Sequence, residues 1–441
     1  MKLVNTYKQI LLALLIFFTV NRVNAQQWSL EQCIDTAQVH NKTLQMSRNS
    51  ILIHEQKEKE AKANLLPKLS LNADYRYFTD QPTQLMPQSV FGGPAGKFKE
   101  ARFGVPHNIN ASVQLSIPIY NAQLNSAIDN SSIASELSEL QYQRSNEQVI
   151  FDISNLYYNA QVLHHQLSFI DSNLINARKL QRNMGLLHEQ LMAKGSDVSK
   201  VDLQVEQLIT QQENVKSRYA QVLNTLKFLM GLPQEKALSI DPVIKYQLIQ
   251  EYTGQPTPDI RQAGIQSRLL AGELNTIRYS RLPTLSLFAS QGTTGFGYDK
   301  SPDQFLKFFP VGFAGVQLSY PIFQGTVIKH RINQKKYELK NNELQISLLN
   351  EQNTMQVENA KKQRSVAVKS AETVLIQIKL AQNIYNQSLL QQKEGTASLT
   401  DVLLADNALR EAQQSYLSAV IDYLKADLDY KKLTGNISVT K

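Results

Sequence analysis

Seven histidines and one cysteine are the first residues of this 441-residue chain to consider as metal ligands or nucleophiles. The histidines show no metal-ligand spacing, and the adjacent His164 and His165 point to different faces of any helix. No serine elbow, glycine-rich phosphate loop or pair of catalytic carboxylates accompanies them. Cys33 is alone, so it forms no intramolecular disulfide, and we interpret it as a free thiol on a helix. We therefore expect no enzyme, no metal site and no cofactor.

The first 25 residues are typical of a cleavable export signal. A basic start at Lys2 precedes an apolar run at 10–20 and the small-residue exit Val23-Asn24-Ala25. An apolar run of about 11 residues is too short for a bilayer, which needs roughly 20. We expect residues 1–25 to be removed from the mature chain.

The charge of the chain is modest for its length. The formal net charge is +8, and three of the basic residues lie in the export signal. The remaining lysines are scattered over polar helix faces, and an exported chain meets no nucleic acid, so we expect no nucleic-acid partner. No long apolar segment follows the signal, so a membrane-spanning part would have to be built from strands.

Four sequence landmarks recur in the same order in the two halves of the chain. Residues 64–71 return at 279–287, 113–120 at 316–323, 194–196 at 394–396, and 228–231 at 432–435. The offsets are 216, 203, 200 and 204 residues, and chance does not produce four landmarks in the same order. We interpret the mature chain as two copies of one unit, residues 26–240 and 241–441.

Proline placement predicts where each copy is helical. The fourteen prolines leave two long tracts free, 119–232 and 322–441, and proline breaks helix interiors. Apolar residues repeat at heptad spacing within both tracts, which is typical of coiled coils. We expect long helices at about 122–194 and 326–394, each on the order of 100 Å, with a return helix after each.

Alternating apolar and polar residues predict two strands in each copy. The strands are expected at about 69–78, 109–119, 284–291 and 313–323. Each has one apolar and one polar face and the length of a tilted membrane-spanning strand. Loops at roughly 79–107 and 292–310 join them. We expect the strand–helix junctions at Pro67, Pro118, Pro283 and Pro321.

Four strands cannot close into a barrel. An open sheet edge in hydrocarbon leaves backbone groups unpaired at several kcal/mol each, so closure has to come from other copies of the chain. Two copies give eight strands with a filled interior, whereas three give twelve strands and room for a lumen. A soluble sandwich would show the same alternation, but the export signal and the internal repeat argue against it.

The order of helix, Leu-Pro-x-Leu strand, loop, strand ending in Pro-Ile-(Tyr/Phe), long helix, glycine turn and return helix, present twice, resembles the TolC family of outer-membrane efflux channels. The resemblance covers the whole mature chain and includes further pieces at 28–34, 258–263 and 394–403. It implies an α+β membrane protein: a trimeric β-barrel of twelve strands, continued by a periplasmic coiled-coil barrel of long helices. The segment 232–258 would belong to a belt around the helical barrel.

The resemblance also implies a function and partners. The chain would be a channel in the outer membrane of a Gram-negative bacterium, with its helical part in the periplasm, and would serve a tripartite efflux or type I secretion system. Its partners would be two further copies in a homotrimer, a periplasmic adaptor (membrane fusion) protein, an inner-membrane transporter of the RND or ABC type, and outer-membrane lipid. An exported coiled-coil stalk or adhesin is the alternative, and it leaves the four strands unexplained.

Carboxylates near the predicted helix turns are the candidate site. Family members narrow their tunnel at the periplasmic tip with rings of acid, and Asp401 matches a ring position by its spacing from Gly395. Three copies of a carboxylate around an axis would favour cations. Asp197, Asp202 and Asp406 lie nearby and either add to the ring or are solvated helix-end charges, and the second interpretation stays open for Asp401 as well.

The same alignment departs from the family at the latch that closes the tip. The latch tyrosine and arginine fall at Gln392 and Ala397, and their partner acid falls near Val201, so this latch is absent or built differently. We expect Gly195 and Gly395 to end helices in the left-handed conformation, which glycine adopts at little cost.

Overall fold

The computed structural model describes residues 27–102, 104–244, 251–298 and 307–437. The export signal predicted at 1–25 lies outside the described residues. Contacts divide the chain into a helical unit, made of Met1–Ser50, Glu139–Gln262 and Ile346–Lys441, and a sheet unit, made of Ile51–Ser138 and Ala263–Gln345. Each unit therefore draws on both halves of the chain.

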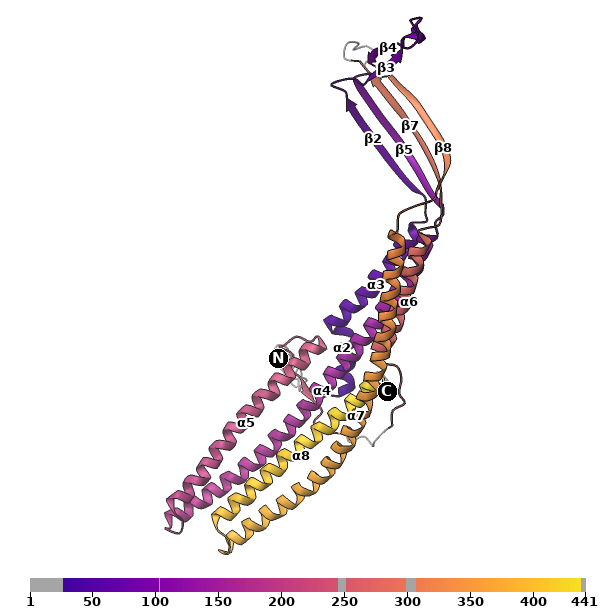
Figure 1. The fold of residues 1–441 in the computed structure, drawn as a ribbon. Helices are drawn as coiled ribbons and strands as arrows, with labels where there is room; N and C mark the ends of the chain where they lie inside the picture. The colour runs from indigo at the N-terminus through magenta and orange to yellow at the C-terminus, as the bar shows by residue number, and fades with distance from the viewer. Residues whose placement is uncertain (1–26, 103, 245–250, 299–306, 438–441) are drawn as a thin grey trace, which may run out of the picture. The chain divides into compact units, whose positions relative to one another are not determined.

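Two helical hairpins make up most of the helical unit (Figure 1). One consists of α4 (Ala122–Glu189) and α5 (Gly195–Met230), and the other of α7 (Val327–Lys393) and α8 (Leu399–Leu433); α4 and α7 each begin in the sheet unit. Within the helical unit the two hairpins are joined by buried contacts such as the hydrogen bond that Asn173 of α4 donates to Gln413 of α8, at 2.7 Å.

A second part of the helical core surrounds α2 (Leu30–His40). Cys33, Ala37 and Leu44 pack there against α4 and α5, next to the two-stranded parallel sheet of β1 (Gln27–Trp28) and β6 (Ser239–Ile240). Cys33 is fully buried, and burial raises the pKa of its thiol to about 12. Because the thiolate is the reactive form of cysteine, this residue is a packing group.

The sheet unit contains a four-stranded antiparallel sheet in the order β2-β5-β7-β8. The strands are β2 (Lys68–Tyr77), β5 (His107–Tyr120), β7 (Thr284–Gly297) and β8 (Lys307–Ser319). The unit also holds most of α3 (Lys42–Ala63) and α6 (Pro258–Tyr279). Since β2 and β8 have one neighbour each, they are the two edges of this sheet.

Helix α6 packs closely on the first part of α4 within the sheet unit. Asn130 and Ser126 hydrogen-bond to Thr276, at 2.9 and 2.8 Å. A Cβ at Gly272 would overlap the Asn130 amide oxygen, so a larger residue there would displace the Asn130 side chain. An exposed ion pair between Arg268 and Glu136, at 2.9 Å, continues the same interface.

The second strand pair is longer than the alternation predicts. Strand β7 continues to Gly297 and β8 begins at Lys307, so much of the loop expected at 292–310 is paired strand. The period-two pattern is hidden there by glycines, and the ring of Phe308 covers Gly295 where a Cβ would stand. Pro310 is tolerated because β8 is an edge strand.

Three of the four prolines predicted at strand–helix junctions lie between a strand and a helix. Pro67 and Pro283 directly precede β2 and β7, and Pro321 follows the end of β8. Pro118 instead lies inside β5, where the register shifts between Pro118 and Tyr120. A bulge accepts a residue that cannot donate a ladder hydrogen bond, so the strand runs past this proline.

The loop expected at 79–107 contains a small sheet of its own. Strands β3 (Thr83–Pro87) and β4 (Phe98–Arg102) pair antiparallel, with a short 3₁₀ helix at Gln88–Phe91 between them. Among the described helices, none is long and apolar enough to cross a membrane.

Candidate functional site

The ends of the two helical hairpins are the region where the sequence places its candidate residues. In the first hairpin α4 ends at Glu189, and the chain turns through Leu191, whose φ is 61°. The Met192 N–H donates to the Leu187 carbonyl at 2.8 Å, which is the 6→1 bond of a Schellman motif. Helix α5 then begins at Gly195.

The second hairpin turns in the same way. Helix α7 ends at Lys393, Gly395 has a φ of 74°, and the Thr396 N–H donates to the Gln391 carbonyl at 2.9 Å. Gly395 is therefore the left-handed residue that the sequence predicts. Gly195 is not: it is the first residue of α5, and the prediction of a helix-ending role for it was wrong.

Leu191 occupies the position in the first hairpin that Gly395 occupies in the second. The sequence carried a signal for this, because the spacing that relates the landmarks 228–231 and 432–435 also relates Leu191 to Gly395. The landmarks 194–196 and 394–396 align Gly195 with Gly395 instead, and glycine is the usual left-handed residue. Leu191 is 93% exposed, so its side chain contributes little packing to offset the strain.

Replacing Leu191 with glycine is expected to stabilise the first hairpin by about 1 kcal/mol, because a left-handed residue with a Cβ costs roughly 1–2 kcal/mol. The thermal midpoint of the helical circular-dichroism signal measures the change. Met192→Gly, one residue further on and outside the left-handed region, is the control and is expected to give no gain. A gain of equal size in both variants would contradict the strain argument.

Asp401 forms a helix cap at the start of α8. The Asp401 N–H donates to the Ser398 Oγ at 3.2 Å, and Asp401 Oδ2 accepts from the Ser398 N–H and hydroxyl at 2.9 and 2.7 Å. This is a capping box with aspartate as the third residue. Hydrogen bonds from Ser398 lower the pKa of the carboxyl. Asp401 is exposed, and its Oδ1 takes no part in the cap.

The other predicted carboxylates have different local partners. Asp197 lies in the first turn of α5 and pairs with Lys200 at 3.1 Å. Asp202 accepts a hydrogen bond from Gln181 of α4 at 2.8 Å, which ties the two helices of one hairpin together. Each therefore has a structural contact of its own.

Asp406 is buried between the hairpins. Gln204 of α5 donates a hydrogen bond to it, and Arg410 pairs with it at 3.0 Å. Burial raises the pKa of Asp406, while Arg410 and Gln204 oppose that shift. Its position inside the interface makes it a link between α5 and α8 rather than a surface charge.

Apolar side chains from all four helices meet near the hairpin ends. The cluster contains Leu180 and Met184 of α4, Val201 of α5, Ala381 and Tyr385 of α7, and Leu399, Val402, Ala405 and Leu409 of α8. Val201, expected opposite a latch residue, is fully buried in this cluster. Gln392, at the other latch position, contacts the Met184 sulfur at 3.8 Å. The hairpins are joined here by packing.

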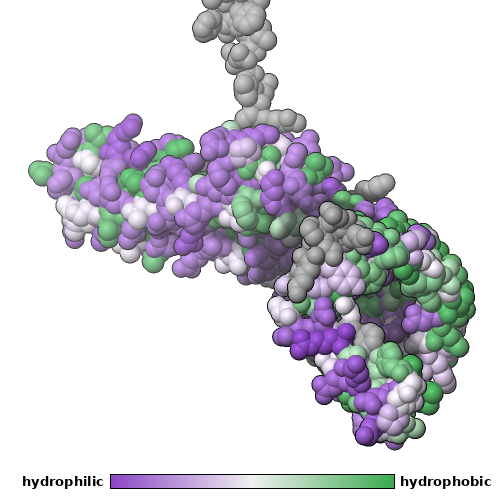
Figure 2. All heavy atoms as spheres, turned by 90° about the horizontal axis from the view of Figure 1, so that it is seen from above, coloured by the Kyte–Doolittle hydropathy of each residue, from purple (hydrophilic) through white to green (hydrophobic). Residues whose placement is uncertain are grey.

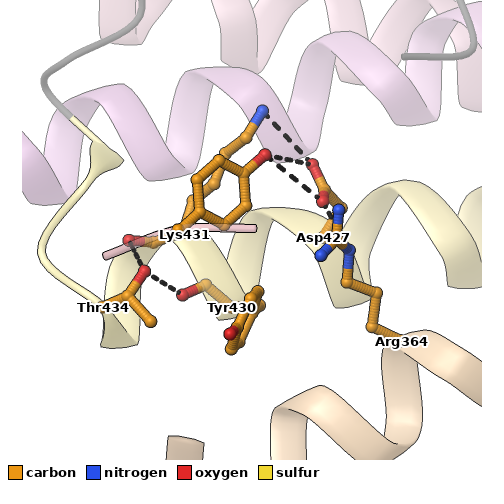
Figure 3. A network of polar contacts seen from close by, with 6 residues as sticks. Arg364, Asp427, Tyr430, Lys431 and Thr434 are labelled. Atoms are coloured by element: carbon orange, nitrogen blue, oxygen red, sulfur yellow. Dashed lines mark hydrogen bonds and ion pairs between the residues drawn. The ribbon is translucent and has the colours of Figure 1, made fainter. Parts of the chain in front are cut away.

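A buried polar network on α7 and α8 was not predicted from the sequence (Figure 3). Arg364 pairs with Asp427 at 2.8 Å, and Lys431 pairs with the same carboxylate at 3.2 Å. The Arg364 guanidinium also lies 5.4 Å from the ring centres of both Tyr252 and Tyr430. Tyr252 precedes α6, so the network fastens the connecting segment to the hairpin.

Burial opposes the charge on Lys431, but Asp427 and Tyr252 raise its pKa above the ordinary value. Thr434 closes the end of α8 by donating to the Tyr430 carbonyl at 2.8 Å. Charged residues in a helix usually face solvent, so no periodic pattern in the sequence predicts that these residues are buried.

Clusters of three or more potential metal ligands do not occur within the described part of the chain. The site consists of exposed hairpin turns, a helix cap, and interfaces between long helices. Such an arrangement positions a helical end and presents it to solvent.

Comparison with known proteins agrees with the fold. The sequence model of a family described as outer membrane efflux protein matches residues 33–232. The outer membrane protein TolC of Escherichia coli is 22% identical over 438 residues, covering 94% of this chain and 83% of TolC. TolC of Salmonella enteritidis is 20% identical over 427 residues with the same coverage.

Solved structures show the same architecture. VceC of Vibrio cholerae has a TM-score of 0.73 at 15% identity and covers 92% of this chain and 96% of its own. The MtrE outer membrane channel of Neisseria gonorrhoeae has a TM-score of 0.73 at 18% identity, with 92% and 89% covered.

The fold is therefore the α+β fold of outer-membrane efflux channels. The match of residues 33–232 to the family of outer membrane efflux proteins and the similarity to TolC agree with the TolC-family resemblance that the sequence pattern predicts. The relatives are outer-membrane proteins, which agrees with the outer-membrane localisation predicted for this chain.

Proposed function

We propose that this protein is the outer-membrane duct of a tripartite efflux or type I secretion system, formed by three copies of the chain. Each copy would give four strands to a twelve-stranded barrel and two hairpins to a periplasmic tube. The duct would export solutes without catalysing a reaction, and its hairpin ends would dock on a periplasmic adaptor above an inner-membrane transporter.

The observation that carries this proposal is the sheet with two open edges and an exposed apolar face. On one face of the sheet Leu69 and Leu71 of β2 are 72% and 73% exposed, and Val316 and Leu318 of β8 are exposed as well. An outward apolar band is what a membrane-spanning strand presents to lipid. The unpaired edges of β2 and β8 can be satisfied by further copies of the same sheet.

Mass measurement and crosslinking test the proposal together. Native mass spectrometry from mild detergent is expected to give a trimer, and a stable monomer would contradict the closure argument. A photo-crosslinking residue at Ala397, beside the second hairpin turn, is expected to capture a periplasmic adaptor in cells. A probe at the exposed Glu235, away from the hairpin turns, is the control. Abundant trimer without any capture at Ala397 would favour a stand-alone pore or a stalk.

We also propose that Asp401 favours cations at the periplasmic entrance, with Asp197 and Asp202 nearby. Asp401→Asn is expected to weaken cation preference, measured as the reversal potential under a salt gradient in a planar bilayer. The asparagine oxygen can still accept from Ser398, so the cap survives. Ser398→Ala, which removes the cap and keeps the charge, is the control and should retain the preference. Unchanged selectivity in Asp401→Asn would leave Asp401 with the capping role alone.

A further inference from the structure

A cavity of about 610 Å³ lies at the end of the four-stranded sheet where β2 and β5 connect to β3 and β4. Its wall includes four aromatic side chains, Phe78, Phe296, Tyr298 and Phe309, together with Asn108 and Lys307. The volume lies within the roughly 300–1,000 Å³ of small-molecule sites. All these residues belong to the sheet unit.

The strand register places the cavity on the polar face of the sheet. Asn108 pairs with Phe296, and Phe296 pairs with Lys307, so these three side chains stand in one row across β5, β7 and β8. Phe309, two residues after Lys307, lies on the same face, and its ring centre is 6.0 Å from that of Phe296. Figure 2 shows the sheet unit hollowed on one side, with hydrophobic and hydrophilic residues both bordering the hollow.

The aromatic rings of the cavity lie beside polar side chains of β2, β5 and β7 that already pair with one another. Asp74 pairs with Arg76 at 2.9 Å and accepts from Asn110 at 3.2 Å, and Asn110 accepts from Thr294 at 3.1 Å. Stacking a flat ligand ring on these aromatic side chains buries apolar surface, which is favourable. The contact between the rings adds stabilisation beyond the buried area.

Two polar groups of the cavity, the Asn108 side-chain oxygen and the Lys307 ammonium, are candidates to contact a ligand. The side-chain oxygen of Asn108 is buried and has no hydrogen-bond partner among the residues that the structure describes. A buried acceptor without a donor is unfavourable, and a ligand that donates a hydrogen bond to it would remove that cost. The exposed Lys307 adds a positive charge to the wall of the cavity, and its ammonium can pair with an anion.

We propose that this cavity binds planar aromatic anions that carry a hydrogen-bond donor. The aromatic side chains stack on the ring system, Lys307 pairs with the acid group, and Asn108 accepts from the donor. The inference rests on the proposed function in one respect: if the polar face is the inner wall of the duct, the cavity is a contact point for amphiphilic aromatic acids near the exit.

Equilibrium dialysis of the trimer in nanodiscs against 6-hydroxy-2-naphthoate tests this proposal. We expect saturable binding to the native protein and an increase in Kd of tenfold or more in Phe309→Ser and Lys307→Gln. Phe313→Ser is the matched control: Phe313 lies on the same face of the same strand, but its ring contacts that of Phe288, with the ring centres 6.1 Å apart, outside the cavity. It is expected to bind as the native protein does.

A second ligand isolates the charge. 2-Naphthol lacks the carboxylate, so it should bind the native protein and Lys307→Gln equally. Binding no greater than that of empty nanodiscs, or an equal loss in Phe313→Ser, would overturn the proposal. Trimer mass and conductance measured on the same preparation separate the proposed duct function from the proposed ligand binding. A conducting trimer that does not bind the probe would contradict ligand binding in the cavity and leave the duct function standing.

Discussion

Asp427→Asn is expected to destabilise the helical unit by about 3–5 kcal/mol, the cost of removing one partner from a buried ion pair. Asp427 serves two cations at once: Arg364 at 2.8 Å and Lys431 at 3.2 Å, with side chains only 7% and 13% exposed. The substitution keeps the shape of the side chain and removes the charge that compensates both. The positive charges then remain close together in a poorly solvated interior.

Thermal unfolding of the protein, followed by helical circular dichroism, measures this loss. Asp259→Asn is the control, because Asp259 also pairs with an arginine, Arg144 at 2.8 Å, but both side chains are at least half exposed. An exposed pair contributes about 0–1 kcal/mol. Hydrogen exchange should also rise at Gly254 and Gln255 in Asp427→Asn, because Tyr252 donates a hydrogen bond to Asp427 and holds this segment. Equal effects of the two substitutions would show that the network does not stabilise the unit.

Gly231→Ala is expected to cost about 3 kcal/mol, as the sum of two effects. Gly231 ends α5 with a φ of 69°, and a left-handed alanine costs roughly 1–2 kcal/mol. A Cβ at this position would also overlap the backbone carbonyl of His40, at the end of α2. Relief of such overpacking requires backbone movement at a typical cost of about 1–3 kcal/mol.

The neighbourhood of Gly231 cannot move without losing other contacts. Asn41, which follows α2, donates to the Leu229 carbonyl at 2.6 Å and accepts from the Leu44 N–H at 3.1 Å. Gly395→Ala is the matched control, since its φ is 74° and no atom lies within 4 Å of the added Cβ. It should cost about 1 kcal/mol in the same thermal assay. A loss in Gly231→Ala no larger than the loss in Gly395→Ala would contradict the clash.

The capping-box motif at Asp401 is visible in the sequence, but the prediction from the sequence concerned only a selectivity role for this residue. Ser398 and Asp401 have the spacing of a capping box directly before an apolar helical pattern. We interpreted Asp401 through its resemblance to family ring acids, and the structure adds a local role for one of its two oxygens. The two roles use different atoms, so the selectivity experiment remains informative.

The sequence by itself located the long helices and the four strands of the main sheet. Heptad spacing and absent prolines locate the long helices, and alternation locates the strands, because both patterns report which face of a local element meets apolar surroundings. The repeated landmarks and the export signal were enough to predict the family.

Tertiary structure alone decided the contacts that join these elements. The pairing of Arg364 with Asp427 and the aromatic wall beside Asn108 depend on residues far apart in the chain or on strand register. Periodicity reports the average environment of a face, whereas pairing of individual charges and rings depends on which side chains meet across an interface.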